Sequence, residues 1–148
     1  MGPLARPFLT GVESSLLDGI IRFRDLDKVK TKGIKTCALT DHGSLAGSYE
    51  FYKEAVKTGM KPILGLEAYW TMDHKTTKEN DLAKSRPNYH MILLAKNKEG
   101  YQSLCKLSSL AYIEGFYYAP RIDDKMLEEY GKNIISTSAC LGSRSSQL

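Results

Sequence analysis

The chain has 148 residues and a formal net charge of +4, with 42% hydrophobic and 26% charged residues. This length suffices for one domain with a hydrophobic core, but it is too short for a complete eight-stranded β/α barrel of ~250 residues. Without an apolar run of ~20 residues, a signal-peptide core or an even set of closely spaced cysteines, the sequence indicates a cytoplasmic protein with no membrane partner.

The first half of the chain predicts a strand followed by a helix. Asp18 lies in a turn at 16–19, upstream of the first clear helix. Residues 36–40 predict a buried strand, which ends in the turn sequence Asp41-His42-Gly43. Residues 44–57 predict a helix that Gly59 ends. Four apolar side chains of this helix are spaced along one face: Leu45, Tyr49, Tyr52 and Val56.

The second half repeats this alternation of strand and helix. The expected elements are, in order, a strand at 62–70, a polar surface loop at 72–87, a strand at 89–95, a helix at about 99–113, a short helix from Asp123 or Asp124 to Gly131, and a strand at 133–139. Strands separated by helices of this length favour a parallel sheet with right-handed crossovers. The predicted fold class is therefore α/β, with ligands expected at the carboxyl ends of the strands.

Five side chains of metal-binding type occupy predicted strand ends or turns: Asp18, His42, Glu67, His90 and Cys140. Carboxylate, imidazole and thiolate groups are ligands that zinc, manganese and iron accept. His42 and Cys140 directly follow strands, and Glu67 lies in the last third of one. His90 breaks the pattern, because it stands near the start of its strand.

Each of these residues also has an ordinary interpretation. Asp18 and His42 could be turn residues only. His90 could be a hydrogen-bonded core histidine, and Cys140 could be a small buried hydrophobe. Glu67 is harder to dismiss, because a carboxylate among apolar neighbours is costly to bury without a partner.

Taken in order, six stretches closely resemble the PHP (polymerase and histidinol phosphatase) domain at the amino terminus of bacterial DNA polymerase III alpha subunits. They are 15–19, 39–43, 61–69, 89–95, 114–123 and 138–142. The Asp-His-Gly and Gly-x-Glu motifs are common to PHP phosphoesterases generally, whereas 97–104 and 116–123 point to the replicative polymerases. We therefore expect a partial PHP domain at 13–142, between divergent segments at 1–12 and 143–148.

The resemblance implies an incomplete, distorted β/α barrel of the PHP type, which is similar to a TIM barrel and has mainly parallel strands. It implies a site for up to three divalent ions, whose ligand positions here are Asp18, His42, Glu67, His90 and Cys140, with Asp41 orienting His42. An intact site of this kind would use the ions to activate water against a phosphodiester. Some members resemble proofreading 3′–5′ exonucleases, and others serve as silent scaffolds that dock a separate exonuclease subunit.

The sequence departs from the family at its two ends. The family's first motif, a strand bearing His-x-His, corresponds here to Leu9 and Gly11, whose side chains cannot bind a metal ion. The last motif, Asp-x-His, would fall beyond Leu148. Losing two clustered histidines should lower metal affinity by orders of magnitude, since changes to supporting residues alone cost ~10–100-fold. A degenerate PHP domain and an incomplete or misjoined reading frame would both produce this pattern.

The leading hypothesis is a PHP-domain fragment of a replicative polymerase alpha subunit. Its parent would extend DNA with magnesium and bind DNA and other replicase subunits, among them a proofreading exonuclease subunit. The fragment itself is expected to lack polymerase activity and to be impaired as a phosphoesterase, and without the His-x-His motif it should hold zinc, manganese or iron weakly. One alternative is a stand-alone PHP phosphoesterase, which the stretch 97–123 and the missing His-x-His oppose. The other is a non-catalytic scaffold or docking module.

Overall fold

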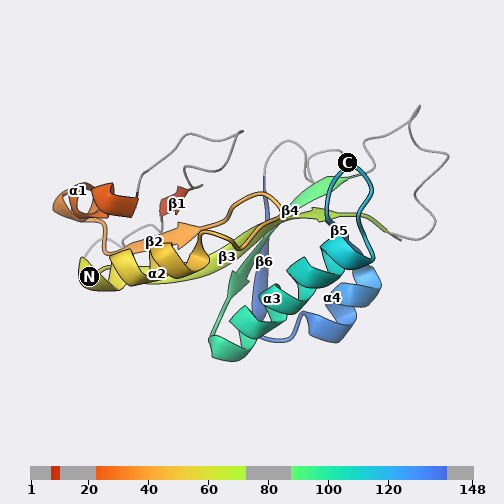
Figure 1. Cartoon of the computed structure of the whole chain (residues 1–148). Helices are drawn as coiled ribbons and strands as arrows, with labels where there is room; N and C mark the ends of the chain where they lie inside the picture. The colour runs from red at the N-terminus through yellow and green to blue at the C-terminus, as the bar shows by residue number, and fades with distance from the viewer. Residues whose placement is uncertain (1–7, 11–22, 73–87, 140–148) are drawn as a thin grey trace.

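The apolar runs between residues 36 and 95 form the centre of a six-stranded sheet in the computed structural model, which describes residues 8–10, 23–72 and 88–139 (Figure 1). The strands are β1 (Phe8–Thr10), β2 (Thr36–Leu39), β3 (Lys61–Trp70), β4 (Tyr89–Ala95), β5 (Arg121–Ile122) and β6 (Ile134–Ser138). The helices are the 3-10 helix η1 (Phe23–Asp25), α1 (Leu26–Thr31), α2 (Ser48–Lys57), α3 (Lys98–Ile113) and α4 (Asp124–Tyr130). Among these helices, none is long and apolar enough to cross a membrane.

The sheet is mixed, with the strand order β1-β2-β3-β4-β6 and with β5 paired to the end of β3. β1, β2, β3 and β5 pair in parallel, whereas β4 runs antiparallel to both β3 and β6. Every described strand except β4 therefore points the same way, which confirms the expected α/β class with mainly parallel strands. The described sheet is open, because β1 and β6 form its two edges.

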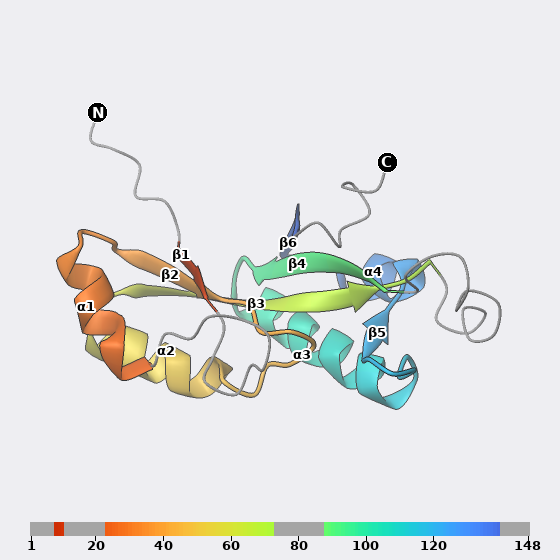
Figure 2. The same ribbon diagram turned by 90° about the horizontal axis from the view of Figure 1, so that it is seen from above.

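Helices α1, α2 and α3 lie along one side of the sheet (Figure 2). Two hydrophobic clusters join them to it. One cluster contains Leu66, Ala68 and Trp70 of β3, Leu93 of β4, and Leu104, Leu107 and Ala111 of α3. The other contains Cys37 and Leu39 of β2 with Leu26, Phe51 and Ala55 of the helices. Because side chains alternate along a strand, this packing places Glu67 and Tyr69 of β3 on the opposite face of the sheet.

Helix α2 begins later than predicted, and the apolar face noted in the sequence is not its buried face. It begins at Ser48 rather than at residue 44, and its buried side chains are Ser48, Phe51 and Ala55. Tyr49, Tyr52 and Val56, which the sequence places together on one face, are 71%, 49% and 52% exposed. The helix carries apolar residues on two faces, so its periodicity alone cannot decide which face contacts β2.

Side-chain caps fix where the last two helices begin. The Asn97 side chain accepts a hydrogen bond from the Gly100 N–H at 2.9 Å, which starts α3. At α4, the fully buried Asp123 accepts from the Met126 N–H at 3.0 Å. Of the two capping residues that the sequence allowed, Asp123 is therefore the cap, and Asp124 is the first residue of the helix.

Candidate metal centre

His42 and Glu67 stand side by side because the β2–β3 pairing continues beyond the end of β2. Leu39 pairs with Leu64 in parallel register, and a bridge three residues further on pairs His42 with Glu67. Two backbone hydrogen bonds close this bridge, from the Glu67 N–H to the Asp41 carbonyl (3.0 Å) and from the Gly43 N–H to the Glu67 carbonyl (2.9 Å). The turn after β2 is thus held in line with the last third of β3.

His90 reaches the same place from the start of its strand. β4 runs against β3, so its beginning lies beside the end of β3, and Tyr69 pairs with His90. Residues directly opposite each other in an antiparallel pair share one face, and their diagonal neighbours lie within side-chain reach. His90 is the diagonal neighbour of Glu67, which pairs with Ile92. The reversed strand explains why His90 departs from the strand-end pattern of the other candidates.

The three side chains form a compact cluster in which each offers one ligand atom, and these atoms lie within 4.8 Å of one another. His90 Nδ1 is 2.9 Å from Glu67 Oε1, and His42 Nε2 is 3.7 Å from Glu67 Oε2. The side chains of His42 and Glu67 are 13% exposed and that of His90 is 24% exposed. The cluster is therefore shielded but still reached by solvent.

Tyr69 completes the described surroundings of the cluster. Its ring lies 6.0 Å from the His42 ring in a stacked orientation and 5.3 Å from the His90 ring edge-to-face. The two imidazole rings are themselves 5.3 Å apart. The sequence reasoning missed Tyr69, although it lies two residues after Glu67 and strand alternation alone places both on one face.

Of the other predicted site residues, Leu9 and Asp41 lie within the part of the chain that the structure describes. Asp18, Gly11 and Cys140 fall outside the described residues. Leu9 belongs to β1, whose backbone pairs it with Ala38 of β2. Asp41 is 5% exposed, directly before His42, and its backbone carbonyl holds Glu67 as described above. Its role in orienting His42 stays a prediction.

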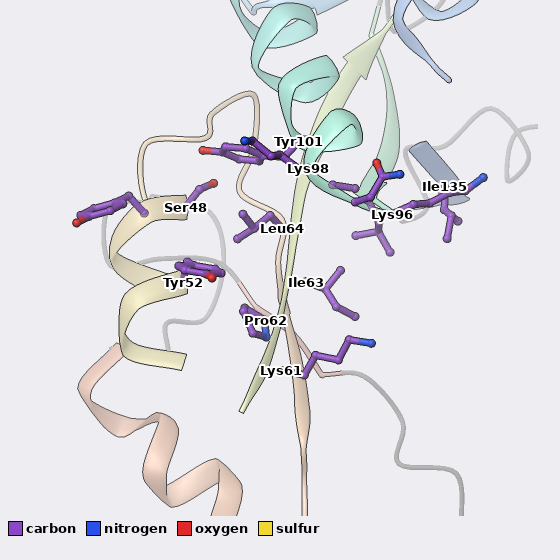
Figure 3. Close-up of a pocket in the computed structure, with 14 residues that line it drawn as sticks. Ser48, Tyr52, Lys61, Pro62, Ile63, Leu64, Lys96, Lys98, Tyr101 and Ile135 are labelled. Carbon is purple, nitrogen blue, oxygen red and sulfur yellow. The ribbon is translucent and has the colours of Figure 1, made fainter. Parts of the chain in front are cut away.

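A separate pocket of about 740 Å³ lies at the other end of β3 (Figure 3). It is bordered by α2, the first half of β3, the end of β4 and the start of α3, including Tyr52, Ile63, Lys96 and Tyr101. None of the three clustered ligands lines it. The pocket and the candidate metal centre are therefore distinct features.

The donor set of the cluster fits a divalent transition metal ion. Two imidazoles and one carboxylate are the ligands of several catalytic zinc and iron sites, which bind the ion through three protein groups and keep further positions open. The partial exposure of His90 leaves access for a small ligand. Residues from a loop and two strands could thus hold one ion at the carboxyl end of β3.

An open, mainly parallel α/β sheet with this cluster at the end of its central strand defines a candidate metal-binding α/β domain. The chain belongs to the PHP domain family, whose model matches residues 12–148. The match begins after Leu9 and Gly11, the positions that the sequence resemblance aligns with the family's His-x-His motif.

Several relatives are alpha subunits of DNA polymerase III. The subunit of Borreliella burgdorferi is 52% identical over 130 residues, which cover 86% of this chain and 11% of that protein. The subunit of Aquifex aeolicus is 49% identical over 132 residues, with coverages of 86% and 11%. That of Deinococcus radiodurans is 44% identical over 141 residues, with coverages of 90% and 11%. The chain spans about a tenth of the length of these curated relatives.

Proposed function

We propose that the chain is the PHP portion of a DNA polymerase III alpha subunit, and that His42, Glu67 and His90 hold one divalent ion in it. The observation that carries this proposal is the three-residue cluster, found in a chain that is 44–52% identical to alpha subunits over most of its length. The parent protein would extend DNA and assemble with other replicase subunits in the cytoplasm. This portion would contribute the metal centre and a folded support.

Each of the three residues has a separate task in the proposed centre. Glu67 supplies the negative charge that offsets the ion. His90 Nδ1 lies 2.9 Å from Glu67 Oε1, so these two atoms are close enough to bind the same ion. His42 Nε2 lies 3.7 Å from the other carboxylate oxygen of Glu67, Oε2. A bound zinc, manganese or iron ion would act as a Lewis acid toward a phosphate group.

The proposed centre is reduced in comparison with a PHP site for up to three ions. Among the residues that the structure describes, three ligand atoms within 4.8 Å of one another suit a single ion. The neighbouring strand β1 carries Leu9 where the family has a histidine, so it adds no ligand at that position. Phosphodiester hydrolysis of the kind attributed to intact PHP sites uses several ions that share the phosphate oxygens. We therefore expect the chain to bind metal without appreciable exonuclease activity.

Metal analysis of the purified chain tests the metal centre. After equilibration with manganese or zinc and removal of free ions, the wild-type chain should retain about one ion, as a site with three protein ligands predicts. Glu67→Gln should retain almost none, because it removes the only negative charge in the cluster. Glu128→Gln, an exposed change on α4, is the matched control and should bind like wild type. A wild-type chain without bound ions would favour a non-catalytic scaffold.

A nuclease assay tests the expected lack of activity. The chain would be incubated with manganese and an end-labelled single-stranded oligonucleotide, and the release of mononucleotides would be followed over time. We expect no release above that of the Glu67→Gln variant. Steady release by wild type that Glu67→Gln abolishes would show that the chain is catalytic without histidines at positions 9 and 11, and the proposed loss of activity would be wrong.

A further inference from the structure

We propose that Tyr69 is a positioning residue that holds both histidines of the cluster in the orientation in which they can bind one ion. This inference rests on the proposed metal centre and assigns a further residue to it. Tyr69 itself is not a ligand in the proposal. Its aromatic ring provides the surface against which the two imidazole rings are ordered.

The contacts of Tyr69 with the two histidines differ in kind. The His42 ring lies nearly parallel to it, with an interplanar angle of 24° and a centroid distance of 6.0 Å. The His90 ring is almost perpendicular to it, at 83° and 5.3 Å. Stacked and edge-to-face arrangements at such distances are the favourable geometries for aromatic pairs. One phenol ring therefore restrains two imidazoles that come from different segments of the chain.

Tyr69 is itself held from two directions. Its backbone pairs with His90 on β4 and with Arg121 on β5. On the side of the His42 turn, Gly43 has φ of +63°, and a Cβ at that position would lie 3.2 Å from Tyr69 Cε2 and 2.7 Å from Pro120 Cγ. The glycine thus lets the turn, the tyrosine and Pro120 pack closely. A ring fixed in this way can orient its neighbours.

Ordering the imidazoles in advance should strengthen metal binding. A histidine without a packing surface samples several side-chain orientations, and binding must select one of them at an entropic cost. Residues that support metal ligands typically change affinity by ~10–100-fold when they are replaced. Because the proposed effect of Tyr69 comes from ring packing and not from a hydrogen bond to a metal ligand, we expect an effect of about tenfold, near the lower end of that range.

The experiment compares Tyr69→Phe, which keeps the ring, with Tyr69→Leu and Tyr69→Met, which remove it. Tyr52→Leu is the matched control, since Tyr52 is 49% exposed on α2 and lines the distant pocket. Manganese or zinc affinity would be measured by calorimetry, and the absorption spectrum of bound cobalt would report ligand geometry. Tyr69→Phe and Tyr52→Leu should match wild type. Tyr69→Leu and Tyr69→Met should bind about tenfold more weakly and give an altered cobalt spectrum.

A measurement without metal separates this inference from the proposed function. Ring currents from Tyr69 should shift the imidazole proton resonances of His42 and His90, and the shifts should persist in Tyr69→Phe and disappear in Tyr69→Leu and Tyr69→Met. If wild type binds no ion but these shifts behave as expected, the metal centre fails while the packing stands. Wild-type affinity and an unchanged cobalt spectrum in both ring-deleted variants would overturn the role of Tyr69. Equal losses in Tyr69→Phe and Tyr69→Leu would also overturn it, because they would assign the effect to the hydroxyl group.

Discussion

Cys37 lies on β2 with no exposed surface, packed in the cluster that joins α2 to the sheet. Burial raises the pKa of its thiol from the ordinary value of 9.0 to about 11. The folded state therefore holds the thiol proton more tightly than the unfolded state does. The resulting stabilisation is fully present below pH 9 and is lost as the pH rises from 9 to about 11.

This shift predicts an alkaline loss of stability that a single substitution should remove. Two pKa units correspond to at most about 3 kcal/mol. The free energy of unfolding would be measured with urea between pH 7 and 11 for wild type and for Cys37→Ala. Wild type should lose up to about 3 kcal/mol more than the variant over that range. Parallel pH profiles would mean that the thiol ionises equally easily in both states.

All three residues of the cluster could be chosen as candidates from the sequence, but for different reasons. Glu67 was conspicuous because a carboxylate in an apolar strand needs a partner, and its partners are His90 and His42. His42 was expected at a strand end, where the bridge to Glu67 places it. His90 could not be justified by position, since that required knowing the direction of β4.

At the scale of elements, the direction of β4 was the main uncertainty. A parallel pair needs a crossover connection, whereas neighbouring antiparallel strands can follow one another without a helix. The polar stretch before Tyr89 has no helical pattern, and this absence favours an antiparallel β4. The expected alternation of strands and helices instead favoured a parallel one. The buried face of α2 could not be predicted from its periodicity either, because its contact with β2 depends on tertiary packing.

Gly100 in the first turn of α3 supports a prediction that opposes helix propensity. Alanine is normally better than glycine inside a helix by about 1 kcal/mol. Here a Cβ would lie 2.2 Å from the Asn133 carbonyl oxygen, which already accepts a hydrogen bond from the Lys96 N–H. Gly100→Ala should therefore destabilise the protein by about 1–3 kcal/mol, the usual cost of overpacking.

Chemical denaturation measures this effect, with Gln102→Ala as the control on the exposed side of the same helix. The control should be neutral or slightly stabilising, because alanine has the better helix propensity. If Gly100→Ala were as stable as the control, α3 could move away from the turn before β6 at no cost. The close approach of these two elements would then not be needed for stability.

For the whole molecule, the exposed apolar surface predicts self-association. Tyr49, Tyr52 and Val56 form an exposed face on α2, next to the pocket at the first half of β3. Among the described strands, β1 and β6 are the edges of an open sheet. Exposed apolar patches and unpaired strand edges both favour association. We expect the average mass in size-exclusion chromatography with light scattering to rise with protein concentration.

Two variants identify the surface responsible. Tyr52→Glu places a charge in the exposed α2 face and should lower the average mass at a given concentration. Lys53→Glu, an adjacent change at an already polar position, should have a smaller effect. A wild-type chain that remains monomeric at all concentrations would show that this surface does not mediate self-association. Association that Tyr52→Glu leaves unchanged would point to the sheet edges instead.

The reversed β4 has a consequence for how the metal centre tolerates change. Six residue pairs fix the register between β3 and β4, and they set the position of His90 beside Glu67. The placement of this ligand thus depends on the paired strands and not on the number of residues between Trp70 and Tyr89. Insertions or deletions in that interval could accumulate among related chains without displacing His90.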